Sequence, residues 1–226
     1  IMLSLVLLTG YGGDVSLAQM TFVGVGALVV GRSFGVVSPA AMLAAALVAG
    51  AVGAVVALPA LRLRGLYLGL GTLAFAAAMD LLVFENSVLG FQLGGSMLIE
   101  RPTLLGISFE SERNYALLAT AAFVGVAWLV LALRRGRVGR RLLASRDSAA
   151  ACGTLGISIT RTRIAVFAMS ASLAGFAGAI YAGASVSVGA TSFEMFQSLP
   201  LLLLAVAGGI TSATGALIGG MLLGFG

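Results

Sequence analysis

Apolar runs separated by short polar segments make up most of the chain. A helix needs about 20 mainly apolar residues to cross a bilayer. Four runs have about this length and predict full membrane-spanning helices, at residues 39–61, 66–84, 115–133 and 164–188. Four shorter runs predict short or broken segments, at residues 1–11, 17–30, 198–209 and 215–226. The pattern therefore predicts an all-α, polytopic helical bundle integral to the membrane, with about seven to nine membrane segments.

The runs also define the domain organisation. Residues 1–226 contain no soluble domain, linker or low-complexity stretch, so we expect a single transmembrane domain. The sequence begins and stops inside apolar runs, and we expect it to be part of a longer protein, truncated at both ends.

Composition supports the membrane class. The chain is 60% hydrophobic and 9% charged, whereas soluble domains carry about 25% charged residues. So few charges cannot cover a globular surface with polar groups, and we therefore expect membrane lipid around the helices.

The charged residues gather in two segments of opposite sign. Residues 134–163 hold eight of the 13 basic residues and one acidic residue, Asp147. Residues 85–113 hold two basic and four acidic residues. Because cytoplasmic loops collect Lys and Arg, we expect a cytoplasmic coupling loop at 134–163 and an external loop at 85–113. A short helix over residues 141–155, closed by Gly156, is predicted within the basic loop.

Several kinds of chemistry are excluded by residue types that this sequence lacks. It has no His, no Lys and one cysteine, Cys152. The usual zinc sites, catalytic triads and Schiff-base sites therefore cannot be built from it, and a Walker A loop requires lysine. The basic residues are explained by membrane orientation, so no nucleic acid partner is expected. Any ATPase that serves this chain lies in a separate subunit or in a domain outside this sequence.

Small residues recur at four-residue spacing in the run at 164–188, at Ser170, Ala174 and Gly178, with Gly175 beside them. This spacing places them on one side of a helix, and small residues let membrane helices approach closely. Tight packing within the subunit is favoured over a dimer interface, although such stripes serve both.

Few polar side chains stand inside the apolar runs, and the main ones are Asp14, Gln19 and Asp80. A charge there is costly and usually faces a cavity or a partner group. Asp80 either reaches the outer interface, caps a partner helix or belongs to a transport path. Asp14 lies at a predicted helix break and is interpreted as a cap. No chain of acidic residues crosses the predicted bundle, which argues against a proton-coupled pump.

Four segments, in order along the chain, resemble branched-chain amino-acid ABC transporter permeases. They are GYGGDVSLAQMTFVGVGA at 10–27, LRLRGLYLGLGTLAFAAAMD at 61–80, GRRLLASRDSAAACGTLGISITRTRIAVFAMSASLAGFAGAIYA at 139–182, and VAGGITSATGALIGG at 206–220. Gln19 departs from the family pattern, because relatives commonly carry His there. Ala149 and Gly153 stand where relatives often carry acidic residues.

The resemblance implies a set of partners and a location. Two similar or identical permease subunits form a pore in the bacterial plasma (inner) membrane. Two cytoplasmic ABC ATPase subunits dock beneath it and use ATP with Mg²⁺, and an external substrate-binding protein delivers the solute. This chain would be no enzyme and would bind no cofactor or metal. The residues implied in ATPase contact are Arg146, Asp147, Leu155, Gly156 and Ile157.

The leading hypothesis is thus a permease subunit of an ATP-driven importer of branched-chain or other amino acids, working by alternating access. Relatives also carry urea, short amides and other small solutes, and these remain alternatives. An ATP-independent secondary transporter or channel, or a membrane scaffold, are the alternatives outside the ABC class. Candidate residues of the substrate path are Ser16, Gln19, Thr72 and Asp80, for which ordinary helix–helix hydrogen bonds are the competing interpretation.

Overall fold

The computed structural model describes residues 1–63, 65–86, 90–91, 97–104, 107–109, 111–154, 158–185, 187–210 and 212–225. Most of them are helical. The helices are α1 (Met2–Leu5), η1 (Val6–Tyr11), α2 (Gln19–Ser33), α3 (Pro39–Ala60), α4 (Leu66–Met79), η2 (Asp80–Phe84), α5 (Glu112–Arg135), α6 (Arg137–Asp147), α7 (Ala149–Thr154), α8 (Ile159–Ser185), η3 (Ala190–Phe193), η4 (Met195–Gln197), α9 (Ser198–Gly208) and α10 (Ala213–Phe225). The strands are β1 (Met97–Leu98), β2 (Thr103–Leu104), β3 (Ile107–Ser108) and β4 (Ser187–Val188).

Five helical segments in the described part of the chain are long and apolar enough to cross a membrane. They are Pro39–Ala60, Leu66–Phe84, Glu112–Arg135, Ile159–Ser185 and Ala190–Gly208. The four predicted full-length helices are confirmed, as is the helical membrane bundle. The segments Met2–Tyr11 and Thr214–Gly224 are shorter apolar helices, and α2 has 15 residues. The expected total of seven to nine membrane segments therefore stays a prediction.

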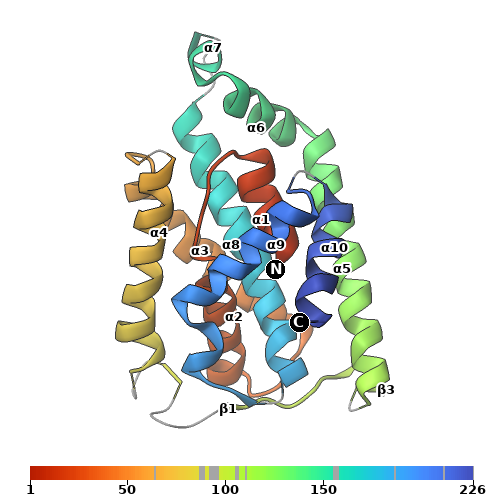
Figure 1. Cartoon of the computed structure of the whole chain (residues 1–226). Helices are drawn as coiled ribbons and strands as arrows, with labels where there is room; N and C mark the ends of the chain where they lie inside the picture. Colours follow the sequence, from red (N-terminus) through yellow and green to blue (C-terminus); the bar gives the residue numbers. More distant parts are fainter. Residues whose placement is uncertain are drawn as a thin grey trace.

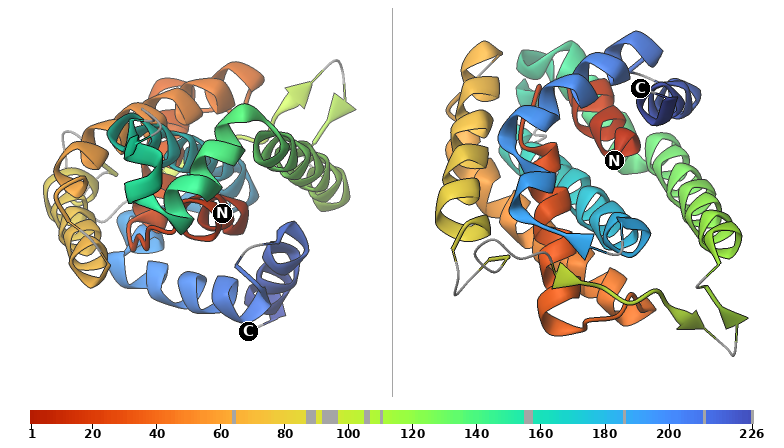
Figure 2. Two further views of the ribbon diagram at one scale, coloured as in Figure 1. Left: turned by 90° about the horizontal axis from the view of Figure 1, so that it is seen from above. Right: turned by 60° about the horizontal axis from the view of Figure 1, so that its bottom comes forward.

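Helix α8 forms the centre of the bundle and packs against α2 and α3 (Figure 1). Backbones approach closely at these contacts: a Cβ added to Gly26 of α2 would lie 2.1 Å from the carbonyl oxygen of Gly175. One added to Gly53 of α3 would lie 2.4 Å from the Cβ of Ala171. Helices α4 and α5 flank this centre on opposite sides (Figure 2), and many of their large apolar side chains are exposed, as lipid contact requires.

The two ends of the bundle differ in structure. Helices α6 and α7 cover one end, and the short strands lie at the other (Figure 1). There β1 pairs antiparallel with β4, and β2 pairs antiparallel with β3. The all-α expectation misses these two-residue strands, which pair loop backbone groups that have no helical partner.

The helix predicted at 141–155 differs from the observed structure. Helix α6 already begins at Arg137, directly after Gly136, which is extended with φ −75° and ψ 178°. A Cβ on Gly139 would lie 2.3 Å from the Leu133 carbonyl oxygen, so this glycine lets α6 fold back closely over the end of α5. Ser148 is extended, with φ −151° and ψ 96°, and it separates α6 from α7.

Candidate functional site

The helical chain is interrupted at residues 12–18. Helix η1 ends at Tyr11 and α2 begins at Gln19, which confirms the interruption predicted after Tyr11. Gly13 has φ +77°, a conformation that glycine adopts without steric cost. In Figure 1 the break descends from the α6 end of the molecule into the bundle, where α2 starts. We call residues 12–18 the helix break.

Three buried polar side chains join the segments on either side of this helix break to α8. The Ser4 hydroxyl lies 3.1 Å from Gln19 Oε1, and Gln19 Nε2 donates to Ser170 Oγ at 3.0 Å. Ser170 in turn donates to the Ser4 carbonyl oxygen at 2.8 Å. None of the three side chains is more than 1% exposed. The network satisfies polar groups that would be costly to leave unpaired in a membrane interior.

The helix break is also held by side chains from neighbouring elements. The backbone N–H of Leu17 donates to Thr72 Oγ1 of α4 at 2.9 Å. Ser16 Oγ accepts from the N–H of Ala18 at 3.3 Å, and both Ser16 and Thr72 are buried. The predicted path residues Ser16, Gln19 and Thr72 therefore surround one place, the point where α2 begins.

Asp80 lies elsewhere, at the strand end of the bundle, where η2 begins. Its Oδ2 accepts from the backbone N–H of Met195 at 2.8 Å, tying α4 to the turn before α9. Among the described residues, Asp80 Oδ1 is buried without a hydrogen-bond partner. The Met195 contact matches the capping interpretation of Asp80, because an N–H at the start of a helical turn has no partner within the turn.

At the opposite end, two arginines of the basic segment at 134–163 contact the helix break and the end of η1 just before it. Arg146 Nη1 of α6 donates to the carbonyl oxygen of Gly10. Arg163 of α8 forms an ion pair of 3.6 Å with Asp14, which is 7% exposed. Burial raises the pKa of Asp14, and the charge of Arg163 opposes that shift. Asp14 is outside the helical segments on either side of it.

A cleft of about 400 Å³ opens beside these groups. It is lined by Gly12, Gly13, Asp14, Leu61, Leu142, Ser145, Arg146, Ile159, Thr160, Thr162, Arg163 and Val166. Two of these lining residues, Leu142 of α6 and Val166 of α8, are buried in an apolar cluster with Leu8. Helix α6 is thus attached to η1 by a polar contact, from Arg146 to Gly10, and by an apolar contact, between Leu142 and Leu8.

The sequence does not indicate the ion pair between Asp14 and Arg163, and the position of Asp14 at a helix break predicts only a cap. The two residues are far apart in the chain, and neither has a spacing that indicates the other. The available signal was the cost of a lone buried carboxylate, which predicts a partner of opposite charge without identifying it.

The residues implied in ATPase contact fall into two groups. Arg146 and Asp147 end α6, and both are exposed over part of their surface. Leu155, Gly156 and Ile157 lie outside the described residues.

The small residues of α8 face the interior of this chain. Ser170 and Ala174 are fully buried. A Cβ on Gly175 would lie 2.4 Å from the Cβ of Ala49, and one on Gly178 would lie 2.0 Å from the Val23 carbonyl oxygen. These positions bring α8 against α3 and α2.

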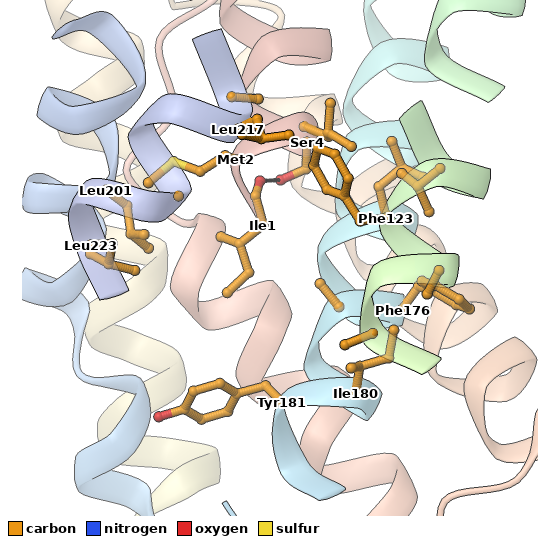
Figure 3. A pocket seen from close by; sticks show the side chains of 18 of the residues that line it. Ile1, Met2, Ser4, Phe123, Phe176, Ile180, Tyr181, Leu201, Leu217 and Leu223 are labelled. Carbon is orange, nitrogen blue, oxygen red and sulfur yellow. Dashed lines mark hydrogen bonds between the residues drawn. The ribbon is translucent and has the colours of Figure 1, made fainter. Parts of the chain in front are cut away.

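An apolar cavity of about 510 Å³ lies between α1, α5, α8, α9 and α10 (Figure 3). Its walls include Phe123, Phe176, Ile180 and Leu201, and Tyr181 lies at one end. Ser4 both lines this cavity and belongs to the buried network with Gln19. The cavity suits an apolar group, with polar atoms at its edge.

Comparisons with known proteins give a consistent result. The chain matches the family described as "Branched-chain amino acid transport system / permease component" over residues 1–225. It is 30% identical over 244 residues to the high-affinity branched-chain amino acid transport system permease protein LivM of Salmonella typhimurium, covering 98% of this chain and 56% of that protein. LivM of Escherichia coli aligns with the same identity and coverage.

A more partial match is the autoinducer 2 import system permease protein LsrC of Klebsiella pneumoniae, 34% identical over 123 residues, which are 48% of this chain and 35% of that protein. No solved structure matches the chain. The chain spans 56%, about half, of the length of the LivM proteins.

Proposed function

The chain belongs to the family of branched-chain amino acid transport system permease components, and we propose that it is the membrane-spanning part of a permease subunit of an ATP-driven importer. It is a multi-pass protein of the bacterial inner membrane. The family match along residues 1–225 is the observation that carries the proposal. The proposed cargo is a branched-chain or other amino acid, as the names of the LivM relatives suggest.

The helix break supports a transport path in this part of the molecule. Broken membrane helices place backbone polar groups inside the bilayer, and such groups commonly form substrate sites in transporters. Ser16 lies in the helix break, and Gln19 and Thr72 lie directly beside it. In the proposed cycle, α2 and the helix break move relative to α8 and α4, and the hydrogen bonds of these side chains rearrange as the path opens to one side at a time.

ATP hydrolysis belongs to separate partners in this proposal. Two cytoplasmic ATPase subunits bind ATP with Mg²⁺ and press on α6 and the residues that follow it. Arg146 and Asp147 would contact them, together with Leu155, Gly156 and Ile157. A second permease subunit completes the pore, and an external binding protein delivers the solute to the strand end.

The solute itself has an alternative. LsrC is named as a permease for autoinducer 2, so a relative of this chain carries a solute that is not an amino acid. Urea, short amides or another small solute are therefore the competing cargo.

The test is reconstitution of the full-length permease with its second subunit and its ATPases in proteoliposomes, with ATP inside and loaded binding protein outside. We expect uptake of radiolabelled leucine that requires ATP and that valine reduces by competition. Uptake that urea or acetamide blocks, and valine does not, would favour the alternative cargo. Solute movement at the same rate without nucleotide, or a permease that binds no ATPase, would refute the importer.

A further inference from the structure

We propose that the Arg146–Gly10 hydrogen bond and the Asp14–Arg163 ion pair form a latch that couples α6 and the first turns of α8 to the helix break. Through this latch, displacement of α6 and of the start of α8 would move residues 12–18 and hence the buried network around Gln19. The inference rests on the proposed function, because α6 belongs to the surface that we propose for the ATPase. Asp14 and Arg163 are positioning residues here, and neither needs to touch solute or nucleotide.

The two latch contacts hold the chain on either side of the turn at Gly12 and Gly13. Gly10, whose carbonyl oxygen accepts from Arg146, precedes Gly12 and Gly13, and Asp14 follows them. The side chain of Arg146 also lies against the turn itself, since a Cβ on Gly13 would be 3.0 Å from its Cγ. A shift of α6 therefore acts directly on the turn.

The ion pair attaches the helix break to a second element, the start of α8. Asp14 is 7% exposed, and a carboxylate at such a site needs an opposite charge close by. Arg163 lies in the first turns of α8, directly after the loop that contains α6 and α7. The pair thus fixes the helix break to the point where the cytoplasmic loop re-enters the bundle. Leu142, 2% exposed against Leu8 and Val166, keeps α6 seated on the same two elements.

From the latch, a short path leads into the bundle. The chain is non-helical from Gly13 to Ala18, and only Val15 and Ser16 separate Asp14 from Leu17, so a movement of Asp14 reaches Leu17 over a short stretch of chain. Leu17 is bonded to Thr72 and Gln19 to Ser170. Movement of Asp14 would therefore strain or break these two hydrogen bonds. The side chains of Gln19 and Thr72 that form them are residues that we place at the solute path.

The decisive experiment compares D14N, R163Q and the double variant in the reconstituted full complex. The readout is the amount of solute transported per ATP hydrolysed, measured beside ATPase co-purification. We expect each single substitution to lower this ratio about five-fold or more while ATP hydrolysis continues. Because the two residues act as one pair, the double variant should be no worse than either single variant, and D14E should recover part of the ratio. Arg161→Gln, an exposed charge on the same turn of α8, is the matched control and should leave the ratio unchanged.

If D14N fails to assemble because its site is buried, R146Q takes its place, since Arg146 is exposed over part of its side chain. R146Q should also lower transport per ATP. Wild-type ratios in the three single variants, or fully additive losses in the double variant, would overturn the latch. Failure of the wild-type permease to bind any ATPase would instead overturn the proposed function, and the latch with it.

Discussion

Gln19 Nε2 donates a hydrogen bond of 3.0 Å to Ser170 Oγ, joining the first residue of α2 to the interior of α8 across 151 residues of sequence. The Ser170 hydroxyl in turn donates a hydrogen bond of 2.8 Å to the Ser4 carbonyl oxygen. Helices α1, α2 and α8 are therefore joined at a single buried point. Loss of one of these partners leaves a buried polar atom unpaired, which is costly in a membrane interior.

Ser170→Ala tests this network. The substitution leaves Gln19 Nε2 and the Ser4 carbonyl oxygen without this partner, so we expect a loss of stability of about 1–2 kcal/mol. Thermal unfolding of the purified protein in detergent measures it as a lower Tm. Ser185→Ala, at the exposed end of α8, is the control. A Tm equal to that of the control would mean that the network does not stabilise the bundle.

Gly178→Ala tests the close approach of α2 and α8. The new Cβ would lie 2.0 Å from the Val23 carbonyl oxygen, so the helices must separate, at a cost of about 1–3 kcal/mol. Gly125→Ala in α5 provides the comparison, because its Cβ meets nothing within 4 Å and alanine favours helix by about 1 kcal/mol. Thermal unfolding should move in opposite directions for the two variants, and a shift of the same sign would contradict the packing argument.

Asp80 can be tested by separating its charge from its hydrogen-bonding capacity. Asp80→Ala removes the acceptor for the Met195 N–H, and we expect it to lower stability by about 1 kcal/mol. Asp80→Asn keeps an acceptor oxygen and should retain both stability and solute uptake. Normal stability with abolished uptake in D80N would place Asp80 in the solute path and remove the capping interpretation.

The orientation of the chain can be measured by cysteine labelling. Cys152 is 2% exposed and is replaced by alanine to give a cysteine-free background. Glu112→Cys at the start of α5 and Arg140→Cys in α6 then introduce thiols at exposed positions, one on each side of the predicted span at 115–133. A membrane-impermeant maleimide added to spheroplasts should label E112C at once and R140C only after permeabilisation. The reverse pattern would invert the predicted topology.

Local sequence features predicted the long helices well, because a membrane span is a property of consecutive residues. The segment Leu66–Phe84 has the predicted bounds, and the charge-poor run at 39–61 corresponds to α3, Pro39–Ala60. Prediction was weaker in the basic segment at 134–163, which has no long apolar run to mark its helices. There the start of α6 depends on how closely Gly139 lets it approach the end of α5, and the extended Ser148 divides the predicted helix.

The candidate site was only partly predictable for a similar reason. Ser16, Gln19 and Thr72 could be chosen as polar groups in apolar runs, but their meeting point depends on how α1, α2, α4 and α8 pack. The contact of Asp80 with Met195, 115 residues away, was equally invisible in the sequence.

The sequence by itself determined that this protein lies in a membrane, where its long helices run and which family it resembles, because apolar length, charge distribution and motif order are carried by neighbouring residues. Only the tertiary structure decided which buried polar groups pair, as Asp14 does with Arg163 and Gln19 with Ser170. A buried charge or amide must find a partner in a medium without water. Its identity depends on the crossing of helices, which the packing of small residues along α8 brings about.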